Sequence, residues 1–228
     1  MGCDVGRHQE PPARLPRRGR QRGHVRAPAQ ALPQGEDRSV ITLLDPAGYR
    51  RTPWKNGGGT TVDIAVSGEA WRFGRTPIVE PGPFSDYAGF DRVQVLVAGS
   101  GLVLETPDGE IDVRQPFRPV RFAGETPIKS RLEAGPVEVV NLIGRREQVK
   151  VEMGVLDEGR TLVLRPGTHI AYTPHGDTEL AIQGNERKLA ADYALRIDTD
   201  VTMRLTGIVG CLLVASVTPE TAPDVSRT

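Results

Sequence analysis

From Ser39 onward, apolar and polar residues alternate in short segments that are separated by Gly and Pro. These segments include "TVDIAV", "RVQVLVAG", "VEVVNLI", "VKVEM", "TLVLRPG" and "VTMRLTG". A period of two places successive side chains on opposite faces of a strand, and helical spacing is nearly absent. The intervening sequences, such as "PGPF", "TPDGE" and "TPHGD", are typical of turns. Many short strands with turns between them predict an all-β sandwich or barrel.

The chain divides into regions of different composition. Residues 1–38 are rich in Pro, Gly and Arg, lack aromatic residues and show no periodicity, so we expect a disordered tail. Residues 39–148 have long, polar loops and form a predicted first half, in which we expect any ligand-binding or catalytic site. Residues 149–217 have tighter strands and form a predicted second half that acts as scaffold. Residues 218–228 are expected to be a flexible C-terminus.

Charge and cysteine content narrow the class of protein. The 29 basic and 29 acidic residues cancel, which argues against a dedicated nucleic-acid-binding protein. The tail has eight Arg and four acidic residues, so the remainder carries 21 basic and 25 acidic residues. The two cysteines lie at opposite ends of the chain, which favours a reducing, cytoplasmic environment. No apolar run reaches the roughly 18 residues needed to cross a membrane, so no membrane association is expected.

The stretch "PWKNGGGTT", residues 53–61, contains three consecutive glycines. It is not a phosphate-binding P-loop, because Lys55 precedes the glycines and "TTVDIAV" reads as a strand rather than a helix. One interpretation is a bulge or corner in a curved sheet, where glycine is common. The other is an anion site, in which the backbone amides of Gly57 and Gly58 face a ligand beside Lys55 and Asn56. Both interpretations remain open from the residues alone.

A second polar cluster lies in "WRFGRTPIVEPGPFSDYAGFDR", residues 71–92. Strand alternation places Trp71 and Phe73 on one face and Arg72 and Gly74 on the other. An Arg beside a glycine can point into a pocket, where its planar guanidinium matches a carboxylate. The alternative is a surface Arg whose stem covers apolar neighbours. The same two interpretations apply to Arg92.

Metal ligation is not expected. Outside the tail the only histidines are His169 and His175, and no His-x-His pair occurs in the chain. A mononuclear site of three His and one carboxylate therefore lacks its ligands. We predict neither a metal nor another cofactor.

The ordered series "PWKNGGGTTVDIA", "WRFGRTPIVEPGPFSDYAGFDR", "GSGLVLE", "FAGE" and "LEAGPVEVVNLIGRR" resembles the HutD/Ves family of bacterial proteins, over about residues 40–150. The resemblance implies a cupin-like fold, an RmlC-like jelly roll, with two cupin halves in one chain (a bicupin). It also implies a link to histidine utilisation, as a regulator that senses a pathway acid such as urocanate or formylglutamate. The sequence departs from the family pattern at Gly74 to Thr76, and at Val139 and Val140 before Asn141.

These observations predict a metal-free bicupin that binds a small carboxylate in its first half. The expected ligand-binding residues are Lys55, Asn56, Gly57, Gly58, Arg72, Arg92 and Asn141. The alternative is a metal-independent isomerase, hydrolase or lyase that acts on a small organic acid in the same pocket, with Asp63, Asp91 or Glu80 as the titrating group. A third interpretation is an interaction module with a filled barrel. On general grounds, pairing through edge strands favours a homodimer.

Overall fold

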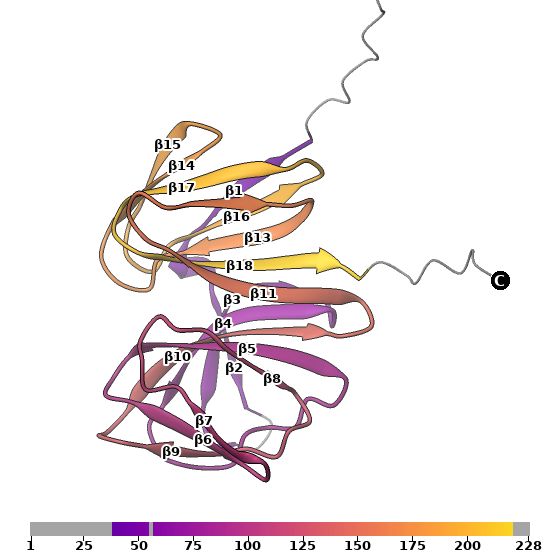
Figure 1. Cartoon of the computed structure of the whole chain (residues 1–228), viewed down its shortest axis with the longest axis vertical. Helices are drawn as coiled ribbons and strands as arrows, with labels where there is room; N and C mark the ends of the chain where they lie inside the picture. The colour runs from indigo at the N-terminus through magenta and orange to yellow at the C-terminus, as the bar shows by residue number, and fades with distance from the viewer. Residues whose placement is uncertain (1–37, 55–56, 221–228) are drawn as a thin grey trace, which may run out of the picture. The chain divides into compact units, whose positions relative to one another are not determined.

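The computed structural model describes residues 38–54 and 57–220. Within these residues the strands form antiparallel sheets of six, five, four and three strands (Figure 1). The only helix there is a short 3-10 turn, η1 (Pro46–Gly48). The period-two pattern of the sequence therefore predicted the fold class correctly, and the chain is all-β.

Each sheet is built from strands that are often distant in sequence. In spatial order, the six-stranded sheet contains β2 (Arg50–Pro53), β3 (Thr60–Ser67), β4 (Trp71–Ile78), β10 (Val137–Arg145), β5 (Phe90–Ala98) and β8 (Val120–Ala123). The three-stranded sheet contains β7 (Gly109–Asp112), β6 (Leu102–Thr106) and β9 (Lys129–Leu132). The five-stranded sheet contains β1 (Val40–Leu44), β16 (Ala194–Thr199), β13 (Gly167–Tyr172), β18 (Leu212–Pro219) and β11 (Val149–Leu156). The four-stranded sheet contains β12 (Thr161–Leu164), β17 (Met203–Val209), β14 (Thr178–Ile182) and β15 (Asn185–Leu189).

Three apolar cores lie between these sheets. The first joins one face of the six-stranded sheet, through Trp71 and Phe73, to the five-stranded sheet, through Ile170 and Tyr172. The Phe73 and Tyr172 rings meet edge to face at 5.8 Å. A second core lies between the five-stranded and four-stranded sheets. The third joins the other face of the six-stranded sheet to the three-stranded sheet. The six-stranded sheet is therefore covered on both faces.

Alternation along β4 decides which side chains each face receives. Trp71 and Phe73 are buried in the first core, as the sequence predicts. Arg72 and Gly74 consequently turn to the opposite face, toward the three-stranded sheet. That face carries the candidate site.

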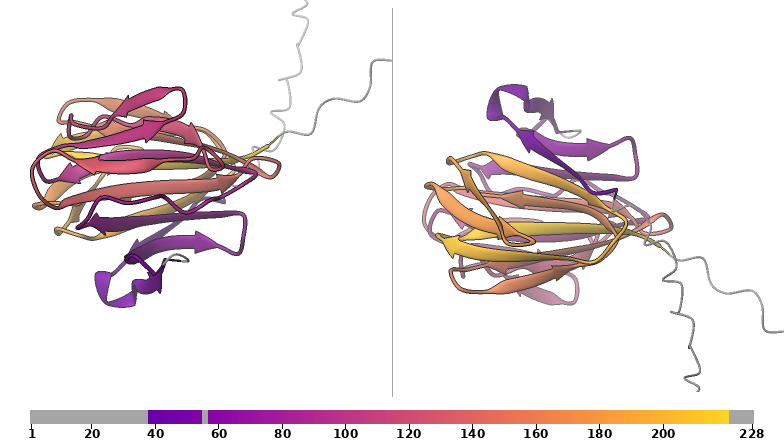
Figure 2. Two further views of the ribbon diagram at one scale, coloured as in Figure 1. Left: turned by 90° about the horizontal axis from the view of Figure 1, so that it is seen from below. Right: turned by 90° about the horizontal axis from the view of Figure 1, so that it is seen from above.

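The N-terminal strands connect two sheets. β1 pairs with β16 at the edge of the five-stranded sheet, and β2 pairs with β3 at the edge of the six-stranded sheet. The indigo segment that carries β1, η1 and β2 lies along one side of the stacked strands in both views of Figure 2. A segment from the predicted first half thus supplies an edge strand to the five-stranded sheet.

The predicted boundaries at residues 38, 148 and 217 stay predictions. Almost all of the predicted tail, residues 1–37, and most of the predicted C-terminus, residues 221–228, lie outside the described residues. No helix within the described ranges has the length and apolar composition needed to span a membrane.

Candidate functional site

A pocket with a cavity volume of ≈ 60 Å³ lies on the face of the six-stranded sheet that Arg72 and Gly74 share. Its floor comes from β3, β4, β5 and β10, and the loop after β4 adds Phe84 and Tyr87. Both polar and aromatic side chains line it, and none of its described lining residues is an Asp or Glu. This composition suits a small anion with an apolar or planar part.

Strand register arranges the floor of the pocket in rows. Ile143 of β10 pairs with Arg72 of β4 on one side and with Arg92 of β5 on the other. One step along the same face, Asn141 pairs with Gly74 and with Gln94. A row with two cations therefore adjoins a row with two amides. Three strands that are distant in sequence supply these side chains, and the ladder of β10 fixes their order.

Arg92 has an unusual environment for a cation. Its side chain is buried, and its guanidinium carbon lies 5.0 Å from the centre of the Phe84 ring, 5.5 Å from that of Tyr87 and 5.1 Å from that of Phe122. Its Nη2 donates a 3.3 Å hydrogen bond to Oδ1 of Asn141. Within the described residues Arg92 forms no ion pair with a carboxylate, and its buried Nε has no hydrogen-bond partner.

The electrostatics of Arg92 follow from this burial. Burial lowers its pKa to about 10; Tyr87 opposes this effect, and the nearby Arg72 charge adds to it. The group remains a cation at neutral pH. Burying a charge without a counterion costs free energy, and an anion bound beside Arg92 would lower that cost.

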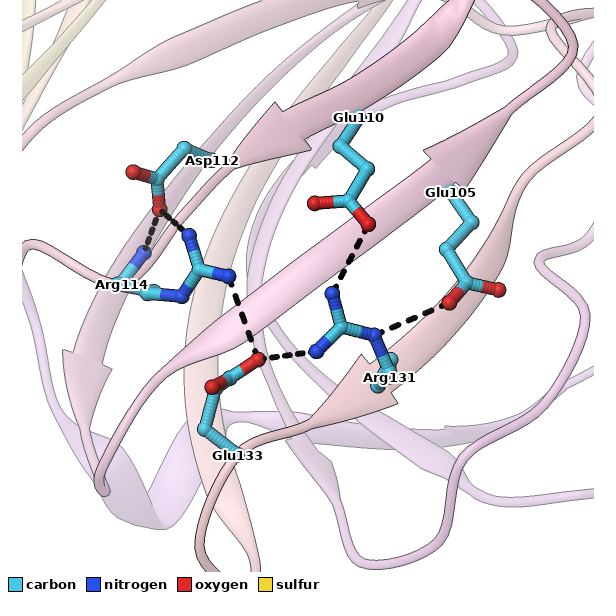
Figure 3. A network of polar contacts seen from close by, with 6 residues as sticks. All are labelled: Glu105, Glu110, Asp112, Arg114, Arg131 and Glu133. Carbon is cyan, nitrogen blue, oxygen red and sulfur yellow. Dashed lines mark hydrogen bonds and ion pairs between the residues drawn. The ribbon is translucent and has the colours of Figure 1, made fainter.

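The surface cluster around Arg131 shows how a structural arginine of this protein differs. Its Nε contacts Glu105 at 3.0 Å and its Nη2 contacts Glu110 at 3.0 Å, while Glu133 bridges it to Arg114 (Figure 3). These side chains are half-exposed, and every charge has a partner. Such a network orders the outer face of the three-stranded sheet and leaves no cation for a ligand. Arg92 has the opposite arrangement.

Arg72 is a shared cation. Its Nε donates to Oδ1 of Asp63 at 3.2 Å, and Nη2 contacts the same oxygen. Asp63 is buried and also accepts from the hydroxyl of Thr52. Part of the charge on Arg72 is thus neutralised within the protein. Arg72 also lines an adjoining open hollow of ≈ 330 Å³, where Arg145 pairs with Glu69 at 3.6 Å.

Glycine is required where β3 and β4 approach each other. A Cβ on Gly74 would lie 2.5 Å from the carbonyl oxygen of Val62, which is backbone and cannot move aside cheaply. The same position lines the pocket, so the absence of a side chain also keeps its floor open. The close approach of β3 and the open pocket floor together explain why a glycine follows Phe73 in "WRFG".

The glycine run after Trp54 shapes one wall of the pocket. The Trp54 amide donates to the carbonyl of Gly59 at 2.9 Å, and a Cβ on Gly59 would meet the indole ring at 3.0 Å. The indole Nε1 donates to the hydroxyl of Thr61 at 3.1 Å, which fixes Trp54 at the pocket wall. Gly57 adopts a positive φ of 73°. Tight packing under Trp54 and a turn thus account for Gly57 and Gly59.

The structure brings together part of the predicted site. Arg72, Arg92 and Asn141 line one pocket, although they come from three different strands. Gly57 and Gly58 are exposed and are not among the lining residues, so their contact with a ligand stays a prediction. Lys55 and Asn56 lie outside the described residues.

Sequence reasoning missed several pocket residues. These are Trp54, Phe84, Tyr87 and Gln94. The aromatic residues are visible in the motifs "PWKNGGGTT" and "GPFSDYAGF", but nothing in their spacing shows that they surround Arg92. Gln94 gave no signal, because a neutral polar residue in a strand usually faces solvent.

Two of the candidate carboxylates and the buried histidine lie elsewhere. Asp91 accepts hydrogen bonds from Arg121 and Arg146. Partial burial raises the pKa of Asp91, but the hydrogen bonds from these two arginines outweigh that effect and lower it. Glu80 is exposed. His169 is buried in the five-stranded sheet between Ser216 and the carbonyl of Arg165. Among the described residues no group of three or more His, Cys, Asp and Glu side chains is placed to hold a metal ion.

Comparison with known proteins places this geometry in a family. The model of the HutD family matches residues 46–212. An uncharacterized 21.2 kDa protein from the hutC 3′ region of Pseudomonas putida is 28% identical over 167 residues, 70% of this chain and 88% of that protein. Protein Ves of Citrobacter koseri is 28% identical over 184 residues, 75% of this chain and 92% of Ves.

Solved structures agree with the sequence relatives. HutD from Pseudomonas fluorescens SBW25 superposes with a TM-score of 0.69 at 26% identity, over 80% of this chain and 100% of that one. A salicylate 1,2-dioxygenase from Pseudaminobacter salicylatoxidans superposes with a TM-score of 0.52 at 8% identity, over 74% of this chain and 83% of that one, and this likeness of fold confirms the predicted cupin-like class. Because the family model spans the strands that build the pocket, the fold and the site lie within one matched segment of sequence, and the chain is a member of the HutD family.

Proposed function

We propose that this protein binds a small carboxylate metabolite of histidine utilisation, of the urocanate or formylglutamate class, and acts as a regulator or sensor rather than as a catalyst. The names of its relatives, HutD and a protein of the hutC region, support the association with histidine utilisation. The ligand and the regulatory role are our inference from the pocket.

The observation that supports this proposal is the buried cation Arg92 at the pocket, which has no carboxylate partner in the part of the chain that the structure describes. A carboxylate beside its guanidinium forms charge-assisted hydrogen bonds and replaces the missing counterion. Arg72 adds a second, partly neutralised cation on the other side of Ile143, and Asn141 holds Nη2 of Arg92 in place. The surrounding rings exclude water, which strengthens each of these interactions.

The direct test is titration calorimetry of the full chain with urocanate and formylglutamate, with the methyl ester of urocanate as the matched neutral control. We expect micromolar binding of an acid, about 8 kcal/mol, and no measurable binding of the ester. Equal heats for acid and ester, or no heat for any small carboxylate, would overturn the proposal.

The pocket favours binding over the alternative of a metal-independent enzyme. Such an enzyme needs an acid or base within reach of its substrate. Asp63, the candidate carboxylate that contacts a pocket residue, is occupied by Arg72 and Thr52. Turnover of a bound acid, followed by chromatography, would support the enzyme instead.

We further propose that the fold consists of two β-sandwiches, each made of two facing sheets, and that they correspond to the two cupin halves of a bicupin. The six-stranded and three-stranded sheets enclose one core, and the five-stranded and four-stranded sheets enclose another. The pocket around Arg92 belongs to the first of these. A homodimer formed through edge strands and a cytoplasmic location remain part of the same proposal.

A further inference from the structure

Gln94 of β5 is one of the residues that form the pocket floor. It follows Arg92 by two residues on β5, so both side chains turn to the same face of the sheet. Its cross-strand partner is Asn141, which also pairs with Gly74. Because Gly74 has no side chain, the space above this row is open beside the two amides. Gln94 is accordingly one of the residues that line the pocket.

The amide of Gln94 is buried but unsatisfied. The residue is 0% exposed, and neither Nε2 nor Oε1 has a hydrogen-bond partner among the described residues. Folded proteins satisfy nearly all such groups, because an unpaired buried amide costs free energy. Apolar residues of similar size would fill this position at lower cost. Without a partner among the described residues, this amide is available to a group that enters the pocket.

The chemistry of an amide restricts that partner. Nε2 donates hydrogen bonds and Oε1 accepts them, so full satisfaction needs a group that both accepts and donates. An amide, an imidazole or a hydroxyl meets this requirement. A second carboxylate or a ketone only accepts, and it leaves Oε1 unpaired. An apolar group leaves both atoms unpaired.

We propose that Gln94 is a specificity-determining residue, which selects carboxylates that carry a second group able to donate and accept hydrogen bonds. This inference rests on the proposed function, since the carboxylate itself is bound at Arg92. Arg92 gives affinity for the anion, and Gln94 discriminates between anions by the rest of their structure. Sites built to hydrogen-bond a substrate reject analogues that lack the bonding group more strongly than apolar pockets reject a change in size.

A matched pair of acids tests the inference. Succinamate and levulinate share a carboxylate and a chain length, and they differ in that the amide –NH2 of the first is a methyl group in the second. We expect the wild-type protein to bind succinamate at least tenfold more tightly than levulinate in calorimetry. In Gln94→Met, which is nearly isosteric, the ratio falls to within about twofold, while levulinate binding is retained.

The outcomes separate this inference from the proposed function. Equal affinities for the two acids in the wild type, or an unchanged preference in Gln94→Met, would overturn the role of Gln94 and leave the carboxylate site standing. If neither acid binds while urocanate or formylglutamate does, a carboxylate with a second donor and acceptor group is not what Gln94 selects, and its proposed role is overturned. If no carboxylate binds at all, the proposed function fails, and this inference fails with it.

Thermal stability gives a second, independent measurement. Replacing an unsatisfied buried amide by an apolar side chain of similar volume is expected to raise the Tm of the ligand-free protein by a few degrees. The exposed Gln115 serves as control, and Gln115→Met should change neither Tm nor the ratio of affinities. A Tm that falls in Gln94→Met would show that the amide is satisfied within the protein, which would contradict a role in ligand selection.

Discussion

Replacing Arg92 by Met should separate ligand binding from stability. The folded protein keeps this cation away from water and, among the described residues, without a carboxylate partner. Burial lowers its pKa to about 10, which corresponds to a penalty of about 3 kcal/mol on the charged form. Contacts with three aromatic rings return about 2 kcal/mol of that penalty. Met fills a similar length without the charge.

The ligand-free variant should therefore be as stable as the wild type, or more stable by about 1 kcal/mol. For a chain of this size that difference raises Tm by about 2 to 4 °C. Binding should respond in the opposite direction. Removing the cation that faces a buried carboxylate costs about 3 kcal/mol, which weakens the affinity roughly 150-fold. Calorimetry with urocanate or formylglutamate and thermal unfolding of the same preparation measure the two effects.

Arg121 provides the control, because it is half-exposed and pairs with Asp91 outside the pocket. Arg121→Met makes the same change in net charge, and it should leave the affinity unchanged. The reasoning is refuted if Arg92→Met keeps the wild-type affinity. It is equally refuted if Tm falls by about 6 °C or more, because a loss of that size, about 3 kcal/mol, is typical of breaking a buried ion pair.

Three further predictions concern the scaffold. Gly74→Ala should lower the stability by about 2 kcal/mol, or about 4 to 8 °C in Tm, because its Cβ would meet a backbone carbonyl oxygen at 2.5 Å. Gly48→Ala, where nothing lies within 4 Å of the added Cβ, should leave Tm unchanged. Tyr172→Phe removes the 2.7 Å hydrogen bond from its hydroxyl to the Asp192 carboxylate and should cost about 2 kcal/mol in urea unfolding; an unchanged midpoint would contradict that estimate. Burial lowers the pKa of His169, so the unfolded chain binds its proton more readily; the stability from this residue is present above about pH 6.5 and decreases as the pH falls below it. The free energy of unfolding should therefore decrease less between pH 7.5 and pH 5 in His169→Gln than in the wild type. An equal decrease in both proteins would exclude His169 as a cause of the pH dependence.

The sequence by itself determined the fold class and the orientation of side chains along each strand. Alternation with period two is a local property, so it predicted strands, and it placed Arg72 and Gly74 opposite Trp71 and Phe73 without knowledge of any neighbour. The resemblance to a known family supplied the cupin-like class. The scarcity of histidine, read as a count, gave the expectation of a metal-free site.

Only the tertiary structure decided which of these side chains meet. The register of β10 between β4 and β5 puts Ile143 beside Arg72 and Arg92, and a slip of β10 by one residue would send Ile143 to the other face of the sheet. The loop after β4 then encloses Arg92 with aromatic rings, and Asp63 takes part of the charge of Arg72. Pairing across sequence-distant strands depends on the whole sheet, and burial without a partner depends on everything packed around it. For that physical reason the sequence alone could not show that, among the described residues, Arg92 lacks a carboxylate partner and the amide of Gln94 lacks a hydrogen-bond partner.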